Sequence, residues 1–140
     1  MYSEAYALIR EILEDEKLNE FVVRTTGKKL AVIDSGPQVT VPAAGIFFNG
    51  GPVSRGENTV QDAEYRVAFA LPYWGSDGMR LCHEFLDVAV EAFFSHELGR
   101  ESGPGRRNYV KTLEPFLAED DPEKQWWTVG VQAVVSMFRE

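Results

Sequence analysis

The chain has 140 residues, of which 22 are acidic and 14 are basic, for a net charge of −8. This length fits one domain, and a hydrophobic fraction of 44% is ample for one core, which excludes a chain that is disordered throughout. An acidic chain is repelled by phosphate backbones, so general nucleic-acid binding would need a local basic patch. The single cysteine, Cys82, excludes an intramolecular disulfide and fits a reducing compartment.

No targeting or membrane segment is expected. The first residues lack an apolar signal core, and nowhere do eighteen apolar residues follow one another. We therefore expect a soluble, cytosolic protein that does not contact a membrane.

The N-terminal segment has the apolar spacing of a helix with one buried stripe. Ser3 is a suitable N-cap, and we expect the helix to run to Leu18 and to fade near Asn19. The residues at the i, i+3, i+4, i+7 and i+8 positions are Ala5, Leu8, Ile9, Ile12 and Leu13.

Short apolar runs broken by turn residues follow, and they predict strands. Pro42 places the third run at a sheet edge or at a strand end. A polar loop from Asn49 to Asp62 comes next, long enough to contact a partner. The expected strands are Phe21–Arg24, Leu30–Ile33, Val39–Val41 and Gly45–Phe48.

The remaining half of the chain predicts strand, helix, strand and strand. Apolar and polar residues alternate over Tyr65–Leu71, and Pro72 ends that strand. Ser76 or Asp77 can cap a helix that runs from Gly78 to Leu98, with Gly99 as its C′ residue. Two strands, Tyr109–Leu117 and Trp126–Phe138, complete the chain, and one face of the last carries Trp127, Val129, Val131, Ala133, Val135 and Met137.

These elements predict one α+β domain, residues 1–140. Its sheet should be mixed but mostly antiparallel, and it should pack against two main helices, the N-terminal helix and the long helix near residues 78–98. No linker or internal repeat divides the chain.

Two groups of residues on the long helix have the composition of a catalytic centre. Cys82, His83 and Glu84 are consecutive, but neighbouring helical side chains point about 100° apart and cannot form a relay. Cys82 lies on the apolar stripe, where a free cysteine behaves as a small hydrophobic residue. His83 and Asp87 are four residues apart and can meet as an oriented general base, although an ordinary surface pair has the same spacing.

The sequence does not predict a metal or cofactor site. The segment His96-Glu97-Leu98-Gly99-Arg100 lacks the second histidine of the zinc-protease helix. The glycine-rich stretches 49–52 and 103–105 match neither a phosphate loop nor a dinucleotide fingerprint, so we expect flexible loops there.

Charge and aromatic placement instead suggest contact surfaces. Arg100, Arg106 and Arg107 gather in one Gly/Pro-rich loop, where the alternatives are a nucleic-acid contact, an acidic patch on a neighbouring subunit, or a solvated loop. The complementary acidic run contains Asp120 and Asp121.

Aromatic side chains at the start of the last strand add to these surfaces. Trp126 and Trp127 are neighbours in a strand and point to opposite faces, so one can enter the core while a helix or a partner must bury the other. The expected interface residues are Arg55, Arg100, Arg106, Arg107, Asp120, Asp121 and Trp126.

Read in order, these elements resemble the small tail-terminator (tail-completion) proteins of long-tailed bacteriophages and prophages. The resemblance covers most of the chain and lies in the order of the elements. Those elements are the helix Ser3–Leu18, short strands ending in Ile46-Phe47-Phe48, the loop Asn49–Asp62, the strand Tyr65–Phe69, the helix Gly78–Leu98 and the strand Trp126–Phe138.

The resemblance implies a homo-oligomeric ring, typically of six subunits, that caps the tail tube and meets the head connector. It implies no catalytic residues, no cofactor, and contact with DNA only as DNA passes through the ring. Such a protein would reside in the bacterial cytoplasm and then in the virion tail. Two alternatives remain: a small dimeric α+β adaptor unrelated to phages, and an enzyme centred on His83 and Asp87.

Overall fold

The computed structural model describes residues 2–33, 40–51, 60–72, 74–98, 106–117 and 126–139. Six strands form one sheet in the order β1-β2-β3-β6-β5-β4, and only the β1–β2 pair is parallel. The elements are α1 (Tyr2–Leu13), α2 (Glu16–Thr26), β1 (Ala31–Ile33), β2 (Ala43–Gly50), β3 (Val60–Pro72), the 3₁₀ turn η1 (Gly75–Asp77), α3 (Gly78–Ser95), β4 (Glu97–Leu98), β5 (Arg106–Leu117) and β6 (Trp126–Arg139).

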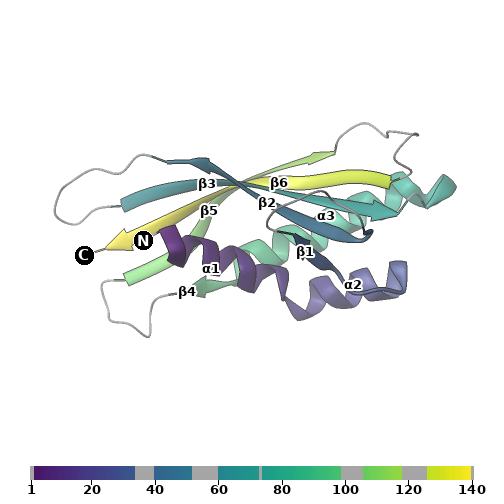
Figure 1. Ribbon diagram of the computed structural model, residues 1–140, viewed down its shortest axis with the longest axis horizontal. Coiled ribbons are helices and arrows are strands. Elements are labelled where there is room, and N and C mark those ends of the chain that lie inside the picture. Colours follow the sequence, from purple (N-terminus) through teal and green to yellow (C-terminus); the bar gives the residue numbers. More distant parts are fainter. Residues whose placement is uncertain are drawn as a thin grey trace.

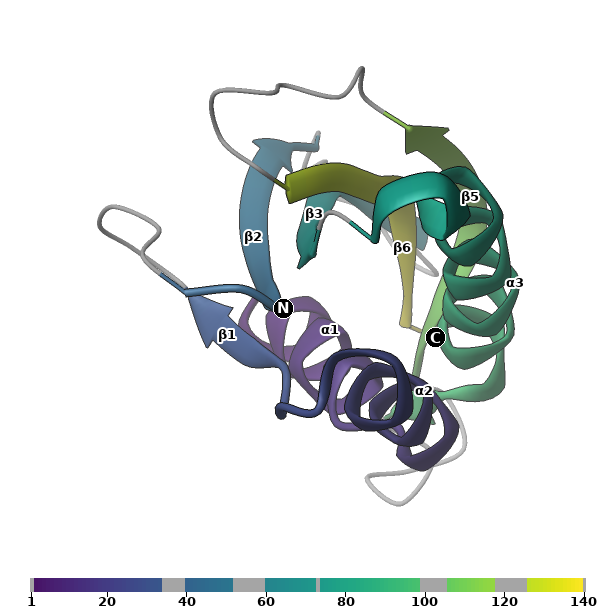
Figure 2. The ribbon, with the colours of Figure 1, turned by 90° about the vertical axis from the view of Figure 1, so that its right-hand side faces the viewer.

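The sheet curls around the helices as a half-barrel. The long strands β3, β5 and β6 run along the length of the molecule (Figure 1), and the three helices occupy the concave side (Figure 2). The residues of β6 that point to this side are buried, as their alternation predicts. The predicted α+β class, with a mixed and mostly antiparallel sheet, is confirmed.

The N-terminal region contains two helices, so the prediction of one helix reaching Leu18 is wrong. The first helix ends at Leu13, and Asp15 caps the second by accepting a hydrogen bond from the Leu18 N–H at 3.0 Å. Gly27, at φ 77°, ends α2 in the left-handed conformation that glycine adopts without a steric penalty.

The predicted strand Phe21–Arg24 is also wrong, because these residues belong to α2. Leu18, Phe21 and Val22 are buried at i, i+3 and i+4, so a helix buries all of them on one side, whereas a strand would split them between two faces. Packing has therefore overridden the local preference of the β-branched residues in this segment.

The next strands along the chain agree in part with the strands predicted from the sequence. The predicted strands at 30–33 and 45–48 correspond to β1 and β2. Of the predicted strand Val39–Val41, residues 40 and 41 lie in a bend that leads to a cis Val41–Pro42 bond, and Val39 is outside the described residues. The expected loop 49–62 is shorter at both ends, since β2 reaches Gly50 and β3 begins at Val60.

The long helix is three residues shorter at its C-terminal end than predicted. It ends at Ser95, His96 is extended, and Glu97–Leu98 pairs with β5 as strand β4, opposite Tyr109 and Asn108. Gly99, the predicted C′ residue, lies outside the described residues, and His96 occupies the capping position. Asp77 precedes the helix as expected but makes no side-chain capping bond.

Strand β5 begins at Arg106, three residues earlier than predicted, and contains a bulge between Val110 and Thr112. On the side of β5 that faces away from β6, the only described neighbour is β4, which pairs with Asn108 and Tyr109. Pro115 pairs with Val131 of β6 and has no described strand on its other side, and such an edge position is where proline usually occurs in a sheet.

Candidate functional site

The triplet Cys82-His83-Glu84 on α3 points in three directions, as helix geometry predicts. Cys82 is fully buried, and burial raises the pKa of its thiol to about 11. His83 is exposed, and its Nδ1 lies 2.8 Å from the carbonyl oxygen of Met79 on the preceding turn. Glu84 accepts a hydrogen bond from Arg80 at 2.9 Å. These three side chains do not form a catalytic relay.

The expected His83–Asp87 centre is not formed in the described part of the chain, where no hydrogen bond or ion pair joins the two side chains. The imidazole instead contacts the backbone of its own helix at Met79. Both residues are exposed, so neither lies in an enclosed site.

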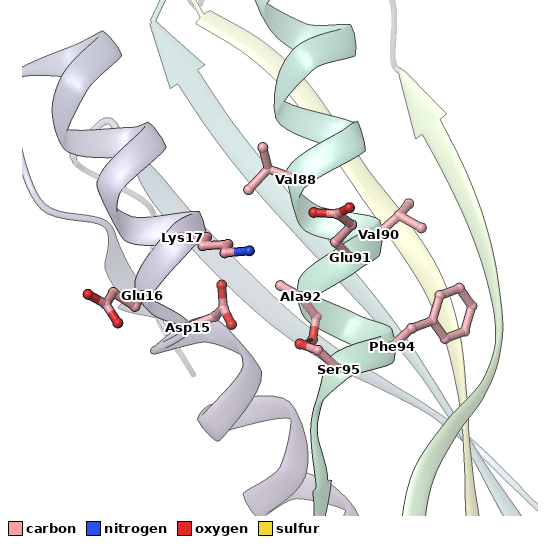
Figure 3. Close-up of a pocket in the computed structure, with 9 residues that line it drawn as sticks. All are labelled: Asp15, Glu16, Lys17, Val88, Val90, Glu91, Ala92, Phe94 and Ser95. Atoms are coloured by element: carbon pink, nitrogen blue, oxygen red, sulfur yellow. Dashed lines mark hydrogen bonds between the residues drawn. The ribbon is translucent and has the colours of Figure 1, made fainter.

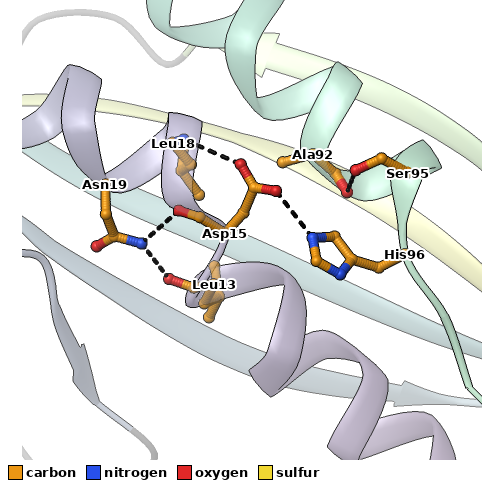
Figure 4. A network of polar contacts seen from close by, with 7 residues as sticks. All are labelled: Leu13, Asp15, Leu18, Asn19, Ala92, Ser95 and His96. Atoms are coloured by element: carbon orange, nitrogen blue, oxygen red, sulfur yellow. Dashed lines mark hydrogen bonds and ion pairs between the residues drawn. The ribbon is translucent and has the colours of Figure 1, made fainter.

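A different histidine pairs with a carboxylate. His96 Nε2 lies 2.8 Å from Asp15 Oδ1, and the second oxygen of Asp15 accepts the Leu18 N–H (Figure 4). Asn19 Nδ2 donates to the carbonyl oxygens of both Leu13 and Asp15, each at 2.9 Å. This network joins the α1–α2 junction to the residue that follows α3.

The environment of Asp15 favours its charged form. Burial alone would raise the pKa of Asp15, but the hydrogen bonds from His96 and from the Leu18 N–H, with the charge of His96, together hold that pKa below its usual value. The side chains of Asp15 and His96 are 16% and 24% exposed. No sequence pattern indicated this pair, because the two residues are 81 positions apart.

A hollow of about 610 Å³ lies beside this network, between α2 and α3 (Figure 3). Ser95 lies on its wall, but the Ser95 hydroxyl donates to the Ala92 carbonyl oxygen at 3.1 Å and is thus engaged with its own helix. The pair Asp15–His96 accordingly connects secondary-structure elements rather than orienting this hydroxyl. The lining residues are Asp15, Glu16, Lys17, Val88, Val90, Glu91, Ala92, Phe94 and Ser95.

Most of the interface residues expected from the sequence lie outside the described residues: Arg55, Arg100, Asp120 and Asp121. Arg106 is the first residue of β5. The Arg107 guanidinium forms an ion pair with Glu97 and lies 4.7 Å from the centre of the Tyr109 ring. Arg107 is therefore engaged with β4 and β5 of its own chain.

The two tryptophans separate as predicted. Trp127 points into the core and is 8% exposed, whereas Trp126, which pairs with Pro72, lies on the outer face and is half-buried. Trp127 packs against Gly78, so the start of α3 is held to the start of β6.

The outer, convex face of the sheet carries a layer of aromatic and cationic side chains that the sequence did not reveal. Phe116 lies over Gly130, its partner on β6, and Arg66 places its guanidinium 4.4 Å from the centre of the Phe116 ring. Phe47 pairs with Arg66 across β2 and β3 and is 53% exposed. This face thus combines a cation–π contact, between Arg66 and Phe116, with the exposed apolar surface of Phe47.

A groove of about 920 Å³ lies between α2 and β1, which we term the α2–β1 groove. Its floor is apolar and includes Val23, Leu30 and Val32, and Val23 is 44% exposed. Its rim is acidic toward the start of α2 and basic toward its end. The lining residues are Arg10, Leu13, Glu14, Glu16, Asn19, Glu20, Val23, Arg24, Lys29, Leu30 and Val32.

A stripe of residues runs along the exposed side of α3, which we term the α3 stripe: Arg80, Glu84, Asp87, Glu91 and Phe94. Successive members are three or four residues apart, the spacing at which side chains lie along one helix face. Phe94 is 53% exposed, an unusual state for a phenylalanine. The stripe is thus acidic, with a large apolar side chain at one end.

Within the described residues, no group of three or more His, Cys, Asp or Glu side chains has the arrangement of a metal site. The helices of this same part are too short or too polar to cross a membrane.

No protein-family model matches the chain, and no curated protein matches it.

Proposed function

We propose that this chain is a structural subunit of a phage or prophage tail, of the tail-terminator kind. Copies would close into a ring that caps the tail tube and joins it to the head connector. The observation that carries the proposal is the distribution of large exposed apolar side chains. They lie on three different elements: Val23 on α2 (44% exposed), Phe47 and Phe48 on β2 (53% and 54%), and Met79 and Phe94 on α3 (49% and 53%).

The separation of these side chains supports a ring over a simple dimer. One self-complementary patch produces a two-fold dimer, whereas unlike patches on different sides of a subunit produce head-to-tail contacts. Head-to-tail contacts close into a ring when the rotation between neighbours allows it. Figure 2 shows β2 and α3 on different sides of the half-barrel, so their exposed side chains cannot serve one patch.

The architecture of the subunit also supports the proposal. Strands β3 and β6 pair over thirteen residues from Val60↔Phe138 to Pro72↔Trp126, and their inner face is buried by the helices. A mixed sheet packed with helices is the fold that the resemblance to tail terminators implies. The net charge of −8 suits a ring through which DNA passes without being held.

The mass of the purified chain in solution tests this function. A closed ring is expected as one discrete species across a wide concentration range, near 95 kDa for about six copies of the 15.8-kDa chain. Native mass spectrometry would give the number of copies, and negative-stain electron microscopy would show a central hole. A monomer or a dimer at every concentration would overturn the ring and favour the adaptor.

A second assay tests the capping role itself. Purified rings are added to polymerising tail-tube protein from the same phage or prophage genome. We expect shorter tubes with a ring visible at one end, and tubes of unchanged length without bound rings would contradict the capping function.

A further inference from the structure

We propose that copies of this chain join when the α3 stripe of one copy enters the α2–β1 groove of the next. This inference rests on the proposed ring and names the surfaces that build it. Figure 2 places β1 and α3 on opposite sides of α2, so one copy can use its groove and its stripe at the same time. The occupant that we propose for the groove is thus a second copy of this chain.

The two surfaces complement each other in apolar area. The groove offers the exposed Val23 above the partly buried Leu30 and Val32. The stripe offers Phe94, an aromatic side chain that is more than half exposed in a single copy. Insertion of Phe94 into the groove would remove the exposed surfaces of both Phe94 and Val23 from water, and an aromatic side chain that fills a pocket is typical of interface hot spots.

The two surfaces also carry unlike charges at one end of the proposed contact. From its N-terminal end, α2 presents Glu16 and Glu20 and then Arg24, and Lys28 and Lys29 follow shortly after the helix. Along α3, Arg80 comes first and is paired with Glu84 and Asp77 of its own chain, and the acidic Asp87 and Glu91 follow. With the two helices aligned in the same direction, Asp87 and Glu91 face Arg24, Lys28 and Lys29, so the charges match at this end of the contact.

The two charged surfaces are similar in length. At 1.5 Å per residue, Arg80 and Glu91 are about 16 Å apart along α3, and Glu16 and Arg24 are about 12 Å apart along α2. Lys28 and Lys29 extend the basic end of the α2–β1 groove beyond α2. The stripe thus spans about three helical turns, and the charges on α2 span about two.

The charges that would meet are available for a partner. In the residues that the structure describes, no ion pair involves Arg24, Lys28, Lys29, Asp87 or Glu91, and all five are exposed. Because exposed ion pairs contribute little each, these charges would select the partner and its orientation while the apolar contact supplies most of the affinity.

Charge reversal on each side tests the contact. The groove variant carries Arg24→Glu and Lys29→Glu, and the stripe variant carries Asp87→Lys and Glu91→Lys. In each variant alone, like charges would meet where residues 24 and 29 of the groove face residues 87 and 91 of the stripe, so we expect the ring to be lost and a 15.8-kDa monomer to remain in native mass spectrometry. When the two variants are mixed, each reversed surface meets its reversed complement, and we expect rings in which the two variants alternate.

The mixing step separates interface loss from misfolding, because two misfolded chains would not restore a ring. Glu114→Lys on β5, an exposed residue outside both surfaces, is the matched control and should assemble like the unmodified chain. Phe94→Ser tests the apolar contact independently and should also yield monomers. Far-ultraviolet circular dichroism would verify that each variant is folded.

The outcomes distinguish this inference from the proposed function. Rings of unchanged mass in both charge variants would overturn the α3–groove contact while leaving the ring in place. Folded variants that remain monomeric after mixing would also overturn it. An unmodified chain that stays monomeric at every concentration would overturn both proposals.

Discussion

The indole ring of Trp127 packs directly on Gly78, at the point where α3 begins beside the first residues of β6. A β-carbon at position 78 would lie 2.8 Å from Cε2 and 2.9 Å from Cζ2 of that ring, well inside van der Waals contact. We therefore expect Gly78→Ala to lower the free energy of unfolding by about 1–3 kcal/mol, the usual cost of overpacking. Urea denaturation followed by tryptophan fluorescence or circular dichroism would measure it.

The control for this prediction is a double-mutant cycle with Trp127→Phe. A smaller ring leaves room for the new methyl group, so the cost of Gly78→Ala should be smaller in the Trp127→Phe background. If the losses of unfolding free energy from Gly78→Ala and Trp127→Phe simply add in the double variant, this result would contradict a direct contact between the two residues.

Gly130 presents a different obstacle, which predicts a different response. A β-carbon there would collide with the carbonyl oxygen of Val67 on β3 and would lie 2.7 Å from Cζ of Phe116. A backbone carbonyl in the paired strands β3 and β6 cannot turn aside as a side chain can. We expect Gly130→Ala to cost about 3 kcal/mol or to prevent folding.

Truncation of Phe116 checks which obstacle dominates at Gly130. Phe116→Ala removes the ring but leaves the Val67 carbonyl in place, so it should not rescue Gly130→Ala. Recovery of stability in the double variant would show that the ring alone excludes a side chain at this position.

The Asp15–His96 pair predicts a dependence of stability on pH. The pKa of Asp15 is lowered in the folded state relative to its value of 3.8 in an unfolded chain. A lowered carboxyl pKa means that the folded state binds the proton less well, so the stabilisation is complete above the unfolded pKa and is lost as pH falls through the folded pKa. We expect the unmodified chain to lose more unfolding free energy below about pH 4 than Asp15→Asn does.

The two substitutions of Asp15 separate its roles. Asparagine is also a good N-cap, so Asp15→Asn removes the charge but keeps the α2 cap, whereas Asp15→Ala removes both and should cost about 1 kcal/mol more. His96→Ala should reduce the acid sensitivity in the same way as Asp15→Asn. Chemical denaturation at several pH values would compare them, and identical pH profiles for all four proteins would contradict the coupling.

The elements predicted well from the sequence are those in which buried residues recur at regular spacing. Alternation in β3 and β6 and the buried stripe of α3 identified these elements and their inner faces, because period 2 and period 3.6 each leave one face apolar. The alternation also predicted that Trp126 and Trp127 point to opposite faces of the sheet. The ends of the elements were predicted less well, since Leu98 belongs to the short strand β4, which forms by pairing with Asn108 and Tyr109 of β5.

The errors have physical causes in particular residues. The strand predicted at Phe21–Arg24 rested on the β-branched Val22 and Val23, although the capping residues Asp15 and Gly27 at either end were the available sign of a helix. The Asp15–His96 pair had no such sign, because only the packing of α2 against α3 brings the two residues together. Exposure of Phe47 and Phe94 was equally invisible, since a phenylalanine in an amphipathic element is normally buried.

The state of Cys82 leads to a final prediction, which concerns reactivity. Its side chain is fully buried on α3, and burial raises its pKa to about 11, far above the value near 8.5 of a free cysteine. Since only the thiolate reacts with disulfide reagents, we expect the native chain to resist modification by 5,5′-dithiobis(2-nitrobenzoic acid) at neutral pH, and to react with one equivalent after denaturation in urea. Rapid reaction of the native chain would show that Cys82 is accessible and would reopen a chemical role for α3.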